Sequence, residues 1–295
     1  MGIDVHALNF LRYSKLKSEM GDVMTIARQG FHILESYVKD PYMIKMVREL
    51  EEAGDNKWCE PMLLKYFGAK KVESIDNSSY EGAKYVHDMN NVLPDKFNSG
   101  YDTIIDAGTL EHIFNIPLAL KNCSKLCRPG GQIIHVLPAN NFCGHGFWQF
   151  TPELFFSLYS EANGYEQTEV YLADVTDINI WYKVHEPKNG VRVNVHTSNR
   201  THILVRTVLK TVDFSHDKVQ QSDYQELWDA KNEKDGYDKG VISTTLLQKL
   251  KTSKPLKKLI LPLYRSFYRL RPPPTMKLNR MNPGLSRFKI KDLIG

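Results

Sequence analysis

Long apolar runs and an apolar N-terminal segment are both missing from this chain of 295 residues. No stretch of 18 consecutive apolar residues occurs, so the sequence predicts no membrane-spanning helix. Charges are scattered through the first fifteen residues, which argues against a secretory signal. His6 stands where N-myristoylation requires Ser or Thr. We therefore expect a cytoplasmic protein.

Cysteines are few, and their spacing is not that of a metal site. Cys123 and Cys127 are four residues apart on a predicted helix, and neither Cys59 nor Cys143 provides a second pair at a suitable distance. We expect buried or half-buried thiols in a reducing compartment, and the sequence predicts no metal.

Acidic residues are nearly absent from the C-terminal part of the chain. From residue 245 onward, thirteen Lys and Arg stand against one acid, Asp292, although the net charge of the whole chain is only +5. Residues 246–270 have the pattern of a basic amphipathic helix, and the last twenty residues are expected to be extended and poorly packed. Such a tail suits the inner face of an anionic membrane, an acidic partner, nucleic acid, or packing on its own domain. We expect peripheral membrane association as one use, and no sequence-specific nucleic-acid partner.

The remaining residues alternate between strand and helix patterns. The expected helices cover 1–20, 41–52, 58–67, 117–126 and 150–161, and the expected strands cover 22–27, 71–76, 85–88, 101–106, 132–137, 168–172 and 202–209. This alternation predicts an α/β fold with a doubly wound, mostly parallel sheet and a ligand at the carboxyl ends of its strands. We divide the chain into an N-terminal helix (1–20), a main domain (21–212), a polar linker or helix (213–244) and the basic tail (245–295).

The stretch from Tyr101 to Leu137 is the most informative. A buried strand ends in the small-residue turn 106–112, with the sequence DAGTLEH, and a helix, the turn RPGG at 128–131 and a second apolar strand follow. Here the chain resembles the central half of a class I S-adenosylmethionine-dependent methyltransferase. The resemblance implies a seven-stranded Rossmann-like sheet with a final antiparallel pair, and S-adenosyl-L-methionine as the cofactor.

Two positions after predicted strands would hold the nucleoside of that cofactor. Asp76 ends a strand and Asn77 follows it, and both are assigned to the cofactor. The Asp76 carboxylate could accept hydrogen bonds from a ribose diol; a solvated turn aspartate is the alternative. Asp88 and Met89 lie where this class contacts adenine. The alternative for Asp88 is capping of the local backbone.

The turn after the first strand departs from the class. Class I methyltransferases usually have a Gly-X-Gly-X-Gly turn here, which lets the backbone approach the donor closely. This chain has Ala27, Arg28, Gln29 and a single glycine, Gly30. We expect either a pocket in which Arg28 or Gln29 meets the donor's carboxylate, or a defective pocket. Arg28 could equally be a surface residue.

Candidate catalytic groups follow the fourth strand, where donor and acceptor would meet. Asp106 and Gly108 are assigned to the cofactor. Glu111 and His112 are adjacent, so one is expected to orient while the other faces the pocket. His112 could take a proton from an acceptor hydroxyl.

The loop after the fifth strand combines aromatic rings with amides. Asn140, Asn141, Trp148 and Gln149 are predicted to bind an acceptor, because aromatic faces beside amide groups suit a sugar or another polyhydroxylated molecule. His145 is a second candidate base. The alternative is a packed loop whose aromatic rings cover the end of the sheet.

A narrower resemblance covers roughly residues 20–210. Residues 76–90, 108–115 and 138–155 resemble a group of methyltransferases associated with surface-polysaccharide biosynthesis, which also replaces the glycine-rich turn with a strand ending in Arg-Gln. This resemblance implies methyl transfer to a hydroxyl or amine of a sugar or glycan-like acceptor.

Other functions are open or disfavoured. A catalytically inactive protein that keeps the methyltransferase fold for binding or as a scaffold is the main alternative, since the glycine-rich turn is missing. A nicotinamide-dependent oxidoreductase is disfavoured because no Gly-X-Gly-X-X-Gly follows the first strand. Nucleic-acid methylation is disfavoured because no Asn-Pro-Pro-Tyr motif follows the fourth.

Overall fold

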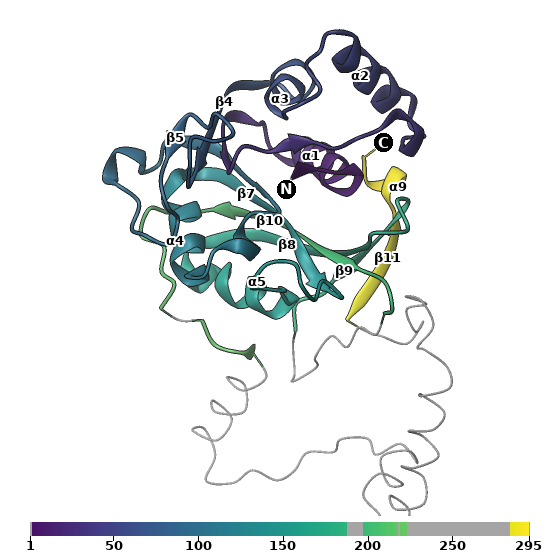
Figure 1. Cartoon of the computed structure of the whole chain (residues 1–295). Coiled ribbons are helices and arrows are strands. Elements are labelled where there is room, and N and C mark those ends of the chain that lie inside the picture. Colours follow the sequence, from purple (N-terminus) through teal and green to yellow (C-terminus); the bar gives the residue numbers. More distant parts are fainter. Residues whose placement is uncertain (1, 188–196, 218, 223–283, 295) are drawn as a thin grey trace, which may run out of the picture.

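The computed structural model describes residues 2–187, 197–217, 219–222 and 284–294 (Figure 1). The predicted basic helix over 246–270 and most of the predicted linker lie outside these residues, so membrane association stays a prediction. Within the described ranges, every helix is too short or too polar to cross a bilayer.

A nine-stranded sheet forms the middle of the molecule, in the order β11-β9-β8-β10-β7-β6-β2-β4-β5. Its strands are β2 (Gly21–Ile26), β4 (Ala69–Asp76), β5 (Tyr85–Val86), β6 (Tyr101–Ala107), β7 (Cys127–Asn140), β8 (Tyr165–Asp174), β9 (Ile180–Val184), β10 (Thr201–Leu209) and β11 (Leu285–Lys289). The predicted α/β class is confirmed. The count of seven strands and the mostly parallel pairing are wrong, because the described strands form four parallel and four antiparallel pairs.

The parallel half of the sheet has the order β5-β4-β2-β6-β7. Chain order runs outward from β2 to β4 and β5, and then resumes on the other side of β2 with β6 and β7. In doubly wound sheets this reversal leaves a crevice outside the carboxyl ends of the two strands at the switch point, here β2 and β6.

Two strands at the other edge were not expected from the sequence. β9 lies between the strands expected at 168–172 and 202–209, where the sequence predicted none, and it buries Trp181 and Tyr182. β11 pairs antiparallel with β9, and α9 (Ile290–Ile294) follows it with Ile290 buried. Within the last twenty residues, Leu285–Lys289 are extended as expected, but they pair with the sheet, and Ile290–Ile294 are helical.

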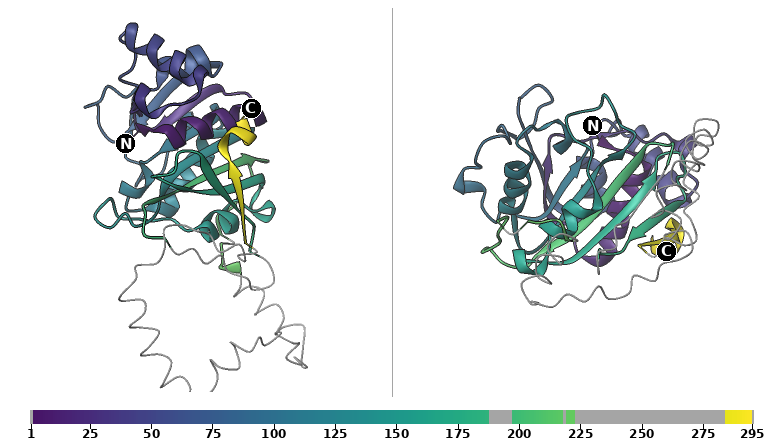
Figure 2. Two further views of the ribbon diagram at one scale, coloured as in Figure 1. Left: turned by 90° about the vertical axis from the view of Figure 1, so that its right-hand side faces the viewer. Right: turned by 90° about the horizontal axis from the view of Figure 1, so that it is seen from below.

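Helices cover both faces of the sheet (Figures 1 and 2). One face carries α1 (Val5–Lys17), α2 (Pro41–Glu52) and α3 (Glu60–Tyr66), and the other carries α4 (Ile116–Leu126) and α5 (Pro152–Leu158). The predicted bounds of α2 are confirmed: Asp40 accepts a hydrogen bond from the Met43 backbone and Pro41 occupies the first turn. In α1, Leu8 and Leu11 are buried, whereas Leu16 is exposed.

A small second sheet brings the N-terminal segment to the carboxyl edge of the main sheet. β1 (Gly2–Ile3) pairs in parallel with β3 (Gly30–Phe31), which follows the turn after β2. The His32 backbone also donates to the Ile3 carbonyl at 2.9 Å. Gly2 and Asp4 consequently line one cavity with Ala107 and Gly108 at the end of β6.

The cysteines divide by burial. Cys59, Cys123 and Cys127 are buried, as expected, whereas Cys143 is exposed on the loop after β7. Burial raises the pKa of the three inner thiols, which keeps them protonated and unreactive.

Candidate functional site

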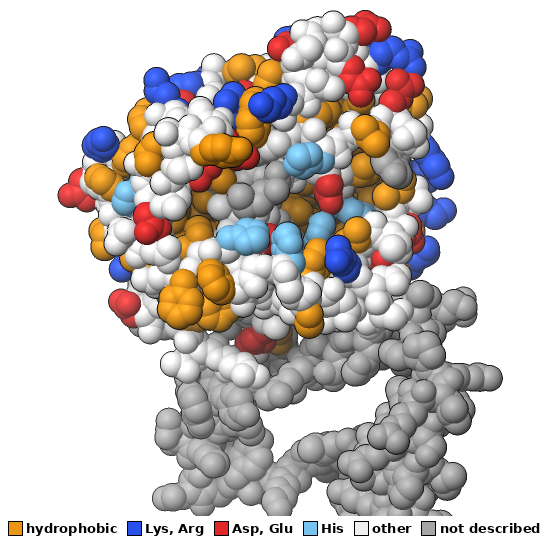
Figure 3. All heavy atoms as spheres, viewed as in Figure 1, with side chains coloured by type: hydrophobic (Ala, Val, Ile, Leu, Met, Phe, Trp, Pro, Cys, Tyr) orange, Lys and Arg blue, Asp and Glu red, His pale blue; other side chains and the backbone are white. Residues whose placement is uncertain are grey.

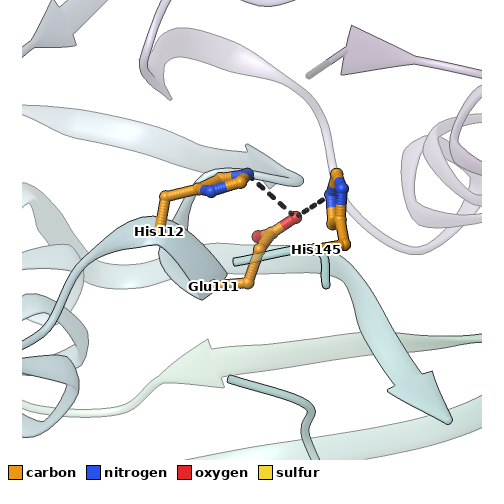
Figure 4. Close-up of side chains that lie close together, drawn as sticks. All are labelled: Glu111, His112 and His145. Atoms are coloured by element: carbon orange, nitrogen blue, oxygen red, sulfur yellow. Dashed lines mark ion pairs between the residues drawn. The ribbon is translucent and has the colours of Figure 1, made fainter. Parts of the chain in front are cut away.

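Three of the predicted catalytic side chains converge at the carboxyl ends of β6 and β7. Glu111 and His112 belong to the short helix η3 (Leu110–His112), and His145 belongs to the loop after β7. The Glu111 Oε1 atom lies 3.4 Å from His145 Nε2 and 3.9 Å from His112 Nε2 (Figure 4). The sequence did not predict that these three meet.

A cavity of about 190 Å³ opens beside this cluster, with Gly108, Glu111, His145 and His202 among its lining residues. Figure 3 shows histidine side chains gathered around a hollow in this face of the molecule. The cluster thus borders a space that a small group of an acceptor could enter.

A buried network fixes η3. The Asp106 Oδ1 atom accepts hydrogen bonds from the backbone of Thr109 at 3.0 Å and Leu110 at 3.3 Å. Its Oδ2 atom lies 2.9 Å from His135 Nδ1, and His135 Nε2 lies 2.7 Å from the Tyr159 hydroxyl. Asp106 is fully buried and both of its oxygens are engaged inside the protein, so neither is free for the predicted contact with a cofactor. Asp106 instead positions the turn that carries Glu111.

The loop after β7 is tied directly to Glu111. The Glu111 carbonyl accepts hydrogen bonds from the backbone of Phe147 at 2.7 Å and Trp148 at 3.3 Å. Trp148 Nε1 also donates to the Ile113 carbonyl at 2.9 Å. Gly146 has φ +73°, and a Cβ there would lie 2.6 Å from the Glu111 carbonyl oxygen. This close approach requires glycine and sets the position of the neighbouring His145.

Burial disfavours charge on the cluster. It raises the pKa of Glu111 to about 8, and the nearby Asp106 adds to the rise. Burial also lowers the pKa of His112, and His145 adds to that effect. In the protein alone, the contacts between these side chains are therefore weaker than those of an ordinary ion pair.

Several loop residues expected to bind an acceptor hold the loop together. Asn141 Nδ2 donates to the carbonyls of Thr197 at 2.9 Å and Asn199 at 2.8 Å. Gln149 Oε1 accepts from the Phe142 backbone at 2.9 Å. For Asn141 and Gln149 the packed-loop alternative is therefore the better description. Asn140 ends β7 opposite Thr201 and is partly exposed.

Aromatic rings form an exposed surface beside the cluster. Phe114 and Phe147 are 72% and 66% exposed, and their ring centroids lie 5.9 Å apart. Trp148, predicted as an acceptor residue, lies 6.4 Å from Phe114. Phe114 was not predicted from the sequence as a site residue.

At the end of β4, Asp76 keeps part of its carboxylate available. Its Oδ1 atom accepts from the Asn77 backbone at 2.6 Å, and among the described residues no hydrogen bond involves Oδ2. Asp88 Oδ1 accepts from the backbone and side chain of Asn90 at 2.9 and 2.8 Å, which is the capping alternative. Met89 is buried in the core, and the expected packing of its side chain on an adenine ring stays a prediction.

The turn after β2 is held from both sides. Gln29 is buried and donates from Nε2 to the Ile26 carbonyl and, at 3.0 Å, to Thr109 Oγ1. Within the described residues its Oε1 atom has no hydrogen-bond partner. Ala27 has φ +58° and is also buried, so its backbone turns sharply where the class has glycine.

Arg28 is engaged inside the protein. Its Nε atom pairs with Glu60 Oε1 at 2.7 Å, and its Nη1 atom donates to the Glu81 carbonyl at 2.9 Å. The guanidinium also lies 4.5 Å from the centroid of the Trp58 ring. Two of its three nitrogens are thus already bonded, which leaves Nη2 for the expected contact with a carboxylate.

Two residues of the site, His202 and Asp4, were not predicted from the sequence. Both line the cavity, with His202 Nδ1 3.5 Å from Asp4 Oδ2. The His202 ring stacks on Phe142, with centroids 5.2 Å apart. No local pattern marks either residue, because the strand pairings β1–β3 and β7–β10 bring them together.

The sequence matches no family model and no curated protein. Among solved structures, the fold is similar to an S-adenosylmethionine-dependent methyltransferase from Thermotoga maritima, at 14% identity over 70% of this chain and 92% of that one, with a TM-score of 0.40. It is also similar to the N-methyltransferase NodS from Bradyrhizobium japonicum, at 12% identity over 69% of this chain and 94% of that one, with a TM-score of 0.37.

A third similar structure is the 1,6-didemethyltoxoflavin-N1-methyltransferase from Burkholderia thailandensis, which contains 1,6-didemethyltoxoflavin and S-adenosylhomocysteine. The identity is 13%, with 70% of this chain and 78% of that chain covered and a TM-score of 0.37.

Proposed function

We propose that this protein transfers a methyl group from S-adenosylmethionine to a hydroxyl or amine of a sugar-like or glycan-like acceptor. The order of the parallel strands carries the proposal. It puts the switch point between β2 and β6, where doubly wound sheets bind nucleotide ligands. β8 and β10 add the final antiparallel pair that the resemblance to class I methyltransferases implies.

Residues at the carboxyl ends of β2 and β4 offer hydrogen-bonding groups to some parts of S-adenosylmethionine. Asp76 offers one carboxylate oxygen to a ribose diol, and Gly108, with φ +85°, lines the cavity at the end of β6. Gln29 Oε1 is a buried acceptor without a described partner, which suits an ammonium group. When bound, S-adenosylmethionine supplies a methyl group on a positively charged sulfur.

The cavity and the aromatic surface would receive the acceptor. Exposed rings of Phe114, Phe147 and Trp148 can stack on the apolar face of a sugar, while the cavity admits its reacting group. The lowered pKa of His112 keeps this imidazole neutral near pH 7, so it can accept a proton from a hydroxyl.

A methyl-transfer assay tests this proposal. The protein is incubated with donor labelled in the methyl group and a panel of nucleotide sugars and oligosaccharides, and label is measured on the acceptor. We expect transfer by the wild-type protein and none by Asp76→Ala, with Glu51→Ala, at an exposed acidic position of α2, as the control. Donor binding without transfer to any polyhydroxylated acceptor would contradict the proposed acceptor class.

The ion pair of Arg28 with Glu60 favours a second candidate, a binding or scaffold protein that keeps the fold without catalysis. In that case Arg28 forms an internal salt bridge with Glu60 in place of a contact with the donor's carboxylate. Folded protein that binds no donor at all would support this second function.

A further inference from the structure

We propose that Glu111, His112 and His145 bind a divalent first-row transition-metal ion, with open coordination positions facing the cavity beside Gly108. The sequence predicted no metal, because its cysteines are not spaced like the ligands of a metal site. These three ligands come from η3 and from the loop after β7, and only the fold brings them together.

The distances fit a single ion. One ligand atom from each side chain can be chosen so that all three lie within 4.8 Å of one another. Two ligands at about 2.1 Å from one zinc ion in tetrahedral geometry are about 3.4 Å apart. The Glu111 Oε1 to His145 Nε2 distance is 3.4 Å, and Glu111 Oε1 to His112 Nε2 is 3.9 Å. Both imidazoles point at the same carboxylate oxygen (Figure 4).

The burial of Glu111 is a second, independent observation that supports a bound cation. Its side chain is only 2% exposed, and its Oε2 atom is buried without a hydrogen-bond partner among the described residues. Burying a carboxylate oxygen without a hydrogen-bond partner is costly, and a directly bound cation offsets that cost. The histidines are more exposed, at 40% for the His112 side chain and 52% for His145, so the ion could enter from solvent.

The chemistry of the ligands selects the class of ion. Mg²⁺ and Ca²⁺ prefer sites made of oxygen atoms, whereas imidazole nitrogens suit Zn²⁺, Fe²⁺, Co²⁺ and Ni²⁺. Three protein ligands leave positions for water or substrate, as in catalytic rather than structural sites. Glu111 and His145 line the cavity, so these positions face it.

The role of the ion follows from this placement, and this step rests on the proposed function. An ion at the cluster would bind an oxygen of the acceptor and lower the pKa of that hydroxyl, whose proton then leaves to water. The histidine nitrogens would act as ligands, and deprotonation would no longer need a free histidine base.

Metal binding can be measured on the protein alone, after removal of any affinity tag and dialysis against a chelator. Zn²⁺ is titrated by calorimetry and Co²⁺ by its visible spectrum, which reports the coordination geometry. We expect one site per chain. His145→Gln, on an exposed loop, and Glu111→Gln should each weaken metal binding by at least about tenfold. Replacing a residue that only supports a metal ligand already costs about tenfold or more in metal affinity. His87→Gln is the control, because His87 is distant in the sequence and contacts the Asn91 carbonyl instead.

Two outcomes would overturn the site: folded wild-type protein that binds neither ion, or binding that is unchanged in both His145→Gln and Glu111→Gln. Circular dichroism of each variant shows whether it is folded, and His112→Gln provides a further ligand variant. S-adenosylhomocysteine affinity is measured in parallel and should stay within about threefold in all of these variants. Metal binding without donor binding would support the metal site and refute the proposed function. Donor binding without metal binding would refute the metal site and leave the proposed function standing.

Discussion

Gly144 and Gly146 offer a matched test of how the loop after β7 positions His145. Both glycines have positive φ, +86° and +73°. A side chain in this region costs about 1–2 kcal/mol at either position. At Gly144 an added Cβ meets no described atom within 4 Å, whereas at Gly146 it would lie 2.6 Å from the Glu111 carbonyl oxygen.

The difference between the two variants follows from that contact. In Gly146→Ala the loop or η3 must move by roughly half an ångström or more to reach ordinary contact, which lengthens the hydrogen bond from Phe147 to Glu111. Loss of such a bond costs a further 1 kcal/mol or so. We expect Gly146→Ala to lower the free energy of unfolding by about 2–3 kcal/mol and Gly144→Ala by about 1–2 kcal/mol.

Urea denaturation gives the two free energies, and Co²⁺ titration shows whether the cluster is preserved. Gly146→Ala should weaken Co²⁺ binding and change its spectrum, while Gly144→Ala should leave both close to wild type. Equal stability losses together with equal Co²⁺ affinities in the two variants would refute the reasoning that Gly146 holds His145 against Glu111.

Two further predictions concern the buried network and an inner histidine. Asp106→Asn should lower the free energy of unfolding by about 1–3 kcal/mol, because His135 and the Thr109 and Leu110 backbone lose a charged acceptor; an unchanged urea midpoint would show that Asp106 does not hold the turn. Burial lowers the pKa of His216, which faces Tyr165, Lys121 and Asp217, to about 4 from an ordinary 6.5. The unfolded chain takes up this proton below pH 6.5, but the folded protein takes it up only near pH 4. The free energy of unfolding should therefore fall by up to about 3 kcal/mol as the pH is lowered from 6.5 to 4. His216→Asn should lose correspondingly less stability between pH 7 and pH 4 in urea denaturation, and identical losses in both proteins would contradict the assignment.

Local patterns predicted the elements that depend on neighbouring residues. α2 follows from an Asp-Pro start and from the spacing of its methionines and Leu50, and it occurs with the expected bounds. β9 was missed because its five residues gain their stability from β8 and from β11, which lies some hundred residues further along the chain. The number of strands therefore could not be read from local sequence.

The site was predicted as separate residues and not as an arrangement. Glu111, His112 and His145 were each singled out, but their convergence depends on the hydrogen bonds from the Phe147 and Trp148 backbone to Glu111. Asp106 was assigned to the cofactor because an acid after a strand has the same local appearance whether it faces a ligand or the core. Its partners His135 and Tyr159 lie on other elements, so only the fold distinguishes the two cases.

Calorimetric titration with S-adenosylhomocysteine tests the central claim, a donor site at the carboxyl ends of β2 and β4, most directly. We predict one site with an affinity in the micromolar range, weakened at least about tenfold in Asp76→Ala because a charged hydrogen-bond acceptor is lost. Glu51→Ala, at an exposed acidic position of α2, should bind like the wild type. Folded wild-type protein that binds no S-adenosylhomocysteine, or an Asp76→Ala variant that binds as well as the wild type, would contradict the account.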